Sequence, residues 1–142
     1  MNLIRTIQAR EIPAWVAMLF RPGPHVGPWV PLYPYMFPFP HRLAQHVAGG
    51  FLYVVYRQQA IGYGTIARVT AQRTAMLVGT VRQAVRPGDA VEVSGVLVHM
   101  PSTLQSVRVR GFMGARYTTQ DLHTLRPALF RTALENAGIV VY

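Results

Sequence analysis

The first half of the chain alternates short hydrophobic patterns with segments rich in proline and glycine. Residues 2–9 have the apolar content of a first strand. Residues 12–19 carry apolar positions at i, i+3, i+4 and i+7, which is the spacing of one face of a helix. A second short helix is predicted at residues 41–48, because Gly49 and Gly50 follow it as stop signals.

Strand patterns dominate the middle of the chain. The continuous apolar and aromatic run at 51–57 predicts a central strand, and Gln58-Gln59 predicts a tight turn into a strand at 60–70. Further strands are predicted at 75–85 and 90–100, joined by a turn at 86–89.

A last strand is predicted at residues 106–112. Val107 and Val109 alternate there with Arg108 and Arg110, so one face of this strand is apolar and the other cationic.

The C-terminal pattern predicts a helix followed by a return to the sheet at 139–141. Thr118 and Asp121 have the spacing of a capping box. Pro127 is expected to kink or divide this helix, and Gly138 to end it. One face of the predicted helix carries Leu122, Leu125, Leu129 and Ala133. Together the elements predict a single α+β domain, residues 1–142, with a mixed, mostly antiparallel, barrel-like sheet and peripheral short helices.

The segment 22–40 interrupts this pattern with seven prolines and several aromatic rings. Proline fixes φ and biases the preceding residue toward extended backbone, so an extended or looped segment is predicted. The segment then either packs across the domain or forms an exposed patch for a partner or a second copy of the chain. So many prolines are incompatible with a membrane-spanning helix. We expect a cytoplasmic protein without a membrane partner, because Glu11 and Pro13 interrupt any secretory signal.

Composition narrows the function classes. The 51% hydrophobic content excludes a disordered chain, and the absence of cysteine excludes a disulfide scaffold and a thiol nucleophile. All 14 basic residues are arginine, against 5 acids, for a formal net charge of +9. Genome composition can account for the missing lysine but not for the shortage of acids. A positive field of this size attracts polyanions.

The sequence gives little support for a metal site or for acid–base catalysis. His41 and His46 are too far apart in sequence to align on one helical face, and His25, His99 and His123 fall in separate elements. Four of the five carboxylates have a structural interpretation: Asp89 in a turn, Asp121 in a cap, Glu135 at a helix end and Glu92 on a solvent-exposed strand face. We therefore predict no metal, no cofactor and no catalytic residue, and an enzyme with a site assembled from distant residues stays an alternative.

Arginine beside aromatic residues is the stronger signal, because arginines can bind phosphates while rings stack on unpaired bases. A solvated cationic strand face with the rings in the core is the plain structural alternative. The predicted phosphate-binding residues are Arg68, Arg108, Arg110 and Arg116. The predicted stacking residues are Tyr63, Phe112 and Tyr117.

Three pieces of the chain carry a family resemblance: FLYVVYRQQAIGYGTIARV, VRPGDAVEV and RGFMGARYTTQDLHTL. With its glycine–x–glycine hairpin and PGD turn, the region 51–125 resembles the PUA-like superfamily, which includes the ASCH and EVE domains. The order of the turn and the hairpin departs from the usual ASCH pattern.

The resemblance implies a pseudo-barrel closed by short helices and recognition of RNA or a modified base in a cleft between them. The segment 22–40 has no counterpart in that superfamily, and an aromatic pocket in which Trp29 or Tyr33 lies beside Tyr63 is a separate hypothesis from the sequence. The amidohydrolase activity of some ASCH relatives requires a lysine, and this chain has none.

The sequence therefore predicts nucleic-acid binding, to RNA or single strands rather than to a duplex. One alternative is a protein-interaction or self-assembly module that uses residues 22–40. The other is a small-molecule or nucleotide enzyme.

Overall fold

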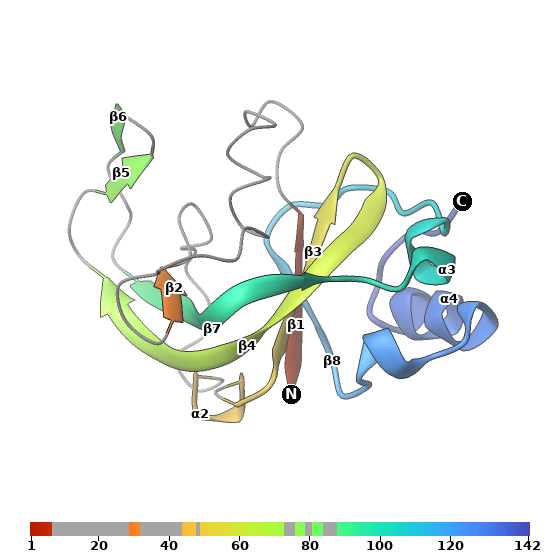
Figure 1. The fold of residues 1–142 in the computed structure, drawn as a ribbon, viewed down its shortest axis with the longest axis horizontal. Helices are drawn as coiled ribbons and strands as arrows, with labels where there is room; N and C mark the ends of the chain where they lie inside the picture. The colour runs from red at the N-terminus through yellow and green to blue at the C-terminus, as the bar shows by residue number, and fades with distance from the viewer. Residues whose placement is uncertain (7–28, 32–43, 48, 73–75, 79–80, 84–87) are drawn as a thin grey trace.

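The central element of the computed structural model is a six-stranded sheet (Figure 1). The structure describes residues 1–6, 29–31, 44–47, 49–72, 76–78, 81–83 and 88–142. The sheet has the order β2-β7-β4-β3-β1-β8. Its strands are β1 (Asn2–Thr6), β2 (Trp29–Pro31), β3 (Phe51–Tyr56), β4 (Gln59–Gln72), β7 (Gly88–His99) and β8 (Ala115–Thr118).

The sheet is mixed and mostly antiparallel, as predicted. Strand β1 runs parallel to β3, while β8, β4, β7 and β2 all pair antiparallel with their neighbours. The sheet has two ends, β2 and β8, that do not pair with each other, so the expected closure into a barrel is wrong. The α+β class is confirmed.

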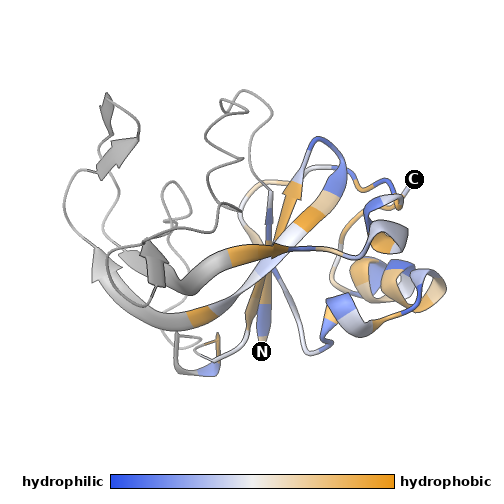
Figure 2. Ribbon diagram, viewed as in Figure 1, coloured by the Kyte–Doolittle hydropathy of each residue, from blue (hydrophilic) through white to orange (hydrophobic). Residues whose placement is uncertain are grey.

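The helices of the described chain are short. They are α2 (Ala44–Val47), α3 (Ser102–Gln105), the 3-10 helix η2 (Leu122–Thr124) and α4 (Pro127–Asn136). Helices α3 and α4 lie together at one end of the molecule, near the C-terminus (Figure 1). Figure 2 shows hydrophobic residues along β3 and on α4, and hydrophilic residues at the turn between β3 and β4.

Strand β3 is buried on both faces, which confirms its prediction as a central strand. Tyr53 and Val55 belong to the hydrophobic core that includes Leu104 of α3 and Phe130 of α4. Leu52 and Val54 alternate with them and are also buried. Burial of a large apolar side chain contributes about 1.5–3 kcal/mol, so this strand anchors the sheet.

Two boundaries in the middle of the chain differ from the prediction. The hairpin turn between β3 and β4 is Arg57-Gln58, one residue earlier than expected, since Tyr56 pairs with Gln59. Both turn residues have left-handed backbone, with φ of 48° and 65°. The strand expected at 75–85 is instead a separate hairpin, β5 (Met76–Val78) and β6 (Val81–Gln83).

The strand expected at residues 106–112 is not formed. The alternation is present, with Val107 and Val109 buried and Arg108 and Arg110 exposed, but the segment makes one isolated bridge, from Val109 to Val141. The side chains alternate because the chain is extended, although no continuous ladder pairs with it. Strand β8 and helix α3, on either side of this segment, were not predicted.

The C-terminal helix begins later than predicted. Pro127 occupies its first turn, where a missing N–H costs nothing. The predicted helix is therefore divided at this proline into η2 and α4 and is not kinked. Of the predicted apolar face, Leu122 and Ala133 are buried and Leu125 packs against the core, as predicted. Leu129 is 58% exposed, so its place in the prediction was wrong, and its neighbour Phe130 is buried instead. Gly138, with φ of 82°, ends the helix as predicted.

Several predictions fall outside the described residues. These are the helix at 12–19, the segment 22–40 apart from β2, and parts of the predicted elements at 2–9, 41–48 and 86–89.

Candidate nucleic-acid interface

The extended segment 106–112 is fixed by main-chain hydrogen bonds to two other parts of the chain. The N–H of Val109 donates to the oxygen of Gln58 at 2.8 Å, and the N–H of Arg110 donates to the oxygen of Val140 at 2.9 Å. The N–H of Tyr142 donates to the oxygen of Arg108 at 3.0 Å. These bonds fix the backbone, so the side chains of Arg108 and Arg110 are held on the exposed side of the segment.

Three residues predicted from the sequence line a single pocket: Arg110, Phe112 and Arg116. Its volume is about 240 Å³, and we call it the arginine pocket. The other residues that line it are Gly111, Met113, Gly138, Ile139 and Val140. None of the described lining residues is acidic, so its electrostatic character is set by the two guanidinium groups.

Within the arginine pocket, Arg116 is held by its own loop. Its guanidinium carbon lies 4.8 Å from the centroid of the Phe112 ring. Its Nη1 donates to the main-chain oxygens of Met113 at 3.0 Å and Ala115 at 3.3 Å. Because both of these bonds come from Nη1, its Nε and Nη2 donors remain for a bidentate anion such as phosphate.

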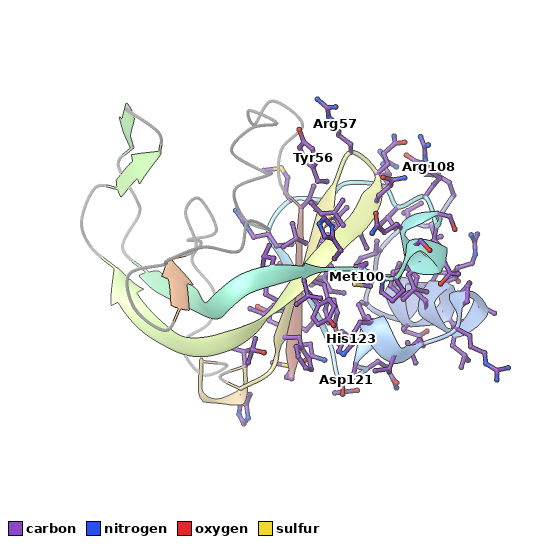
Figure 3. All side chains as sticks on the ribbon, in the orientation of Figure 1. Tyr56, Arg57, Met100, Arg108, Asp121 and His123 are labelled. Atoms are coloured by element: carbon purple, nitrogen blue, oxygen red, sulfur yellow. The ribbon has the colours of Figure 1, made fainter. Side chains whose placement is uncertain are left out.

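Arg108 continues the cationic surface away from this pocket. Its Nη2 donates to the side-chain oxygen of Gln58 at 2.6 Å. Arg57, the residue before Gln58 in the hairpin turn, has its guanidinium carbon 5.2 Å from the centroid of the Tyr56 ring. Figure 3 shows Arg57 and Arg108 near this turn. Arg57 was missed in the sequence, where the turn was assigned one residue too late.

Tyr63 lies in a different cluster and is already stacked. Its ring is parallel to the imidazole of His123, with centroids 4.2 Å apart and planes inclined by 11°. Phe51 and Tyr53 complete the cluster at 5.8 and 5.9 Å from Tyr63. His123 lies toward the opposite end of the hairpin from Arg57 and Arg108 (Figure 3). The structure therefore does not bring Tyr63 together with the arginines.

This aromatic cluster is tied to the buried Asn2, which is 4% exposed. The Asn2 amide donates to the main-chain oxygen of Gln120 at 2.7 Å and to Oδ1 of Asp121 at 3.1 Å. Its side-chain oxygen accepts from the N–H of Phe51 at 2.8 Å. Asn2 thus joins β1, β3 and the loop before η2.

The Tyr53 hydroxyl shares a hydrogen bond with Nδ1 of His123 at 2.9 Å. Burial raises the pKa of Tyr53 above its usual range, and the negative charge of Asp121 adds to the rise. At neutral pH the hydroxyl is therefore a neutral hydrogen-bonding group inside the core.

Tyr117 lines a second pocket, between β8 and the end of α4. Its volume is about 300 Å³, and we call it the amide pocket because Gln120 and Asn136 contribute to it. The remaining lining residues are Met1, Thr118, Thr119, Ala133 and Ala137. Burial raises the pKa of Tyr117.

For the last three predicted residues, the structure describes no side chain. Arg68 lies on β4 in register with Glu92 of β7, and its side chain is outside the described part of the structure. Trp29 lies on β2, with its side chain likewise outside, and Tyr33 is not among the described residues. The predicted aromatic pocket stays a prediction.

Comparison with known protein families, with curated proteins and with solved structures finds no match to this chain. Among the described residues, no group of three or more histidines and carboxylates could hold a metal ion. In the same part of the chain, no helix has the length and apolar content needed to cross a membrane.

Proposed function

We propose that this protein binds RNA or another single-stranded nucleic acid, with phosphates held at the arginine pocket and at Arg108 beside it. The observation that carries the proposal is the convergence of Arg110, Phe112 and Arg116 on one pocket. Two cations and one ring in a single concavity match what a backbone phosphate and an adjoining sugar or base require.

The arrangement of the arginines favours a strand over a compact anion. Arg108 and Arg110 are two residues apart on an extended segment, so their backbones are about 6.6 Å apart. With Arg57 at the neighbouring turn and Arg116 in the pocket, the cations form a track and not a single cluster. A flexible, evenly charged backbone can follow such a track.

The formal charge of +9 supports the same proposal, because it supplies a long-range attraction for polyanions. The PUA-like resemblance supports RNA over DNA as the ligand. Recognition of a modified base by Trp29 or Tyr33 is a hypothesis from the sequence alone and stays part of the proposal.

The test is fluorescence anisotropy with labelled single-stranded RNA, single-stranded DNA and duplex DNA. We expect tighter binding to a single strand than to the duplex. Hydrogen bonds to charged groups contribute about 1.5 kcal/mol or more, so Arg116→Ala should weaken single-strand binding about tenfold.

Arg126→Ala is the matched control, since it removes the same charge from the N-terminal end of α4. The ten residues of α4 separate it from Gly138 in the arginine pocket, a distance of about 15 Å along the helix. Equal weakening by both variants, or equal binding to all three nucleic acids, would overturn the proposal.

A further inference from the structure

The arginine pocket and the amide pocket adjoin each other. Arg116 lines the first and Tyr117 the second, while Gly138 lines the first and Ala137 the second. On β8, Arg116 pairs with Ile4 and Tyr117 with Leu3, so the two side chains point to opposite faces of the sheet, and Ile4 is on the face that packs against α4. The two pockets therefore adjoin through the main chain of β8 and through Ala137 and Gly138 at the end of α4. A Cβ placed on Gly138 would lie 3.9 Å from Nε of Arg116, which confirms that the strand and the helix end are in contact there.

The chemistry changes across this boundary. The arginine pocket presents two guanidinium groups, whereas the amide pocket is lined by Gln120, Asn136, Thr118 and Thr119, whose side chains are polar and uncharged. Apart from the terminal ammonium of Met1, which donates to the main-chain oxygen of His46 at 2.9 Å, the described lining groups are uncharged. A ligand that spans both pockets therefore has an anionic part and a neutral polar part.

Two hydrogen bonds fix the main chain of Gln120, which lines the amide pocket. The N–H of Gln120 donates to the hydroxyl of Thr118 at 3.1 Å, and the main-chain oxygen of Gln120 accepts from Asn2 at 2.7 Å. Within the described chain, the side-chain amides of Gln120 and Asn136 make no hydrogen bond to protein. Each of them can therefore offer one acceptor and two donors to a ligand.

We propose that the amide pocket binds one nucleobase of the strand whose phosphate lies in the arginine pocket. A nucleotide has the required division between an anionic phosphate and a neutral base with donors and acceptors on its edge. Side-chain amides pair with such edges. The inference rests on the proposed function, because it extends the same site by one unit of the ligand.

The experiment compares a single-stranded RNA with a strand of equal length whose bases are absent, measured by anisotropy on wild-type protein and on two variants. Asn136→Ala removes an amide from the exposed last turn of α4. The base-bearing strand should bind this variant about fivefold more weakly than wild type, since one hydrogen bond is lost. The abasic strand should bind both proteins equally.

Arg116→Ala separates this inference from the proposed function. It should weaken both strands by a similar factor, because it removes a phosphate contact. If Arg116→Ala weakens both strands while Asn136→Ala changes neither, the base pocket is wrong and the proposed function stands. If Arg116→Ala has no effect on either strand, the proposed function itself is wrong.

Discussion

Arg116 lies over the ring of Phe112, with its guanidinium carbon 4.8 Å from the ring centroid. The ring faces one side of the guanidinium while two main-chain oxygens hold Nη1, so the cation has a fixed direction in a pocket that is open to solvent. Such a contact contributes about 0.5–1 kcal/mol at an exposed site. Its larger effect is on binding, because a fixed guanidinium loses less entropy when it engages an anion.

Phe112→Leu tests this relationship. The variant keeps an apolar side chain in the half-buried position but removes the ring under Arg116, so single-strand affinity should fall about threefold to fivefold. Phe112→Tyr, which keeps the ring, is the control and should bind as wild type does. The two variants are compared by anisotropy at one salt concentration. Equal affinity of Phe112→Leu and Phe112→Tyr would contradict a role for the ring.

Arg57→Gly should change stability and binding in opposite directions. Arg57 has φ of 48°, a left-handed conformation that costs a residue with a Cβ about 1 kcal/mol and costs glycine nothing. The free energy of unfolding, measured with urea, should therefore rise or stay level, while single-strand affinity should fall because a cation of the track is lost. A stabilised variant with undiminished affinity would remove Arg57 from the interface.

Asn2→Ala should destabilise the protein by about 2–3 kcal/mol. The change leaves the N–H of Phe51 and the main-chain oxygen of Gln120 without their partner, and unsatisfied buried groups are costly. Asn2→Asp keeps the acceptor for Phe51 but loses the donor and places a second carboxylate beside Asp121. It should be destabilised by a similar amount at pH 7 and partly recover in acid. A loss below about 0.5 kcal/mol in both variants would show that the network contributes little.

The free energy of unfolding should fall in alkaline solution because of the raised pKa of Tyr53. Its pKa is raised on folding from 10.0, so between that pH and the folded pKa the native state binds the proton more tightly than the unfolded state. The contribution of this group is therefore complete below pH 10 and is lost above it, by up to about 1.4 kcal/mol per pH unit. Tyr53→Phe should show a shallower decline of unfolding free energy between pH 10 and 11. Tyr142→Phe, at an exposed position, is the control, and an unchanged decline in Tyr53→Phe would contradict the assignment.

Local patterns predicted those parts of the fold that depend on neighbouring residues. The continuous apolar run of β3 predicts a buried strand, and Gly138 predicts a helix end, because each signal is complete within a few residues. Strand β8 was missed because its four residues are all partly buried and show no alternation. The order of the strands depends on the pairing of β1 with β3 and with β8, both of which lie far along the chain. No local pattern contains these pairings, so the sequence could not show that the sheet stays open.

The candidate site shows the same division. Arg110, Phe112 and Arg116 are close in sequence, so their convergence on one pocket could be anticipated from RGFMGARYT. Tyr63 was assigned to the same interface, but His123, from a distant part of the chain, stacks on it. That contact depends on the placement of η2 against the sheet, which in turn depends on Asn2. A sequence pattern carries no signal for it.

The most direct test of the proposed interface is the salt dependence of single-stranded RNA binding. For a single strand, the logarithm of affinity falls against the logarithm of salt concentration with a slope of about −0.7 for each phosphate contact. Arg110→Ala and Arg116→Ala should each reduce the magnitude of this slope by about 0.7, whereas Arg126→Ala should leave it unchanged. If all three variants reduce the slope equally, the positive charge acts as a general field and the arginine pocket is not the binding site.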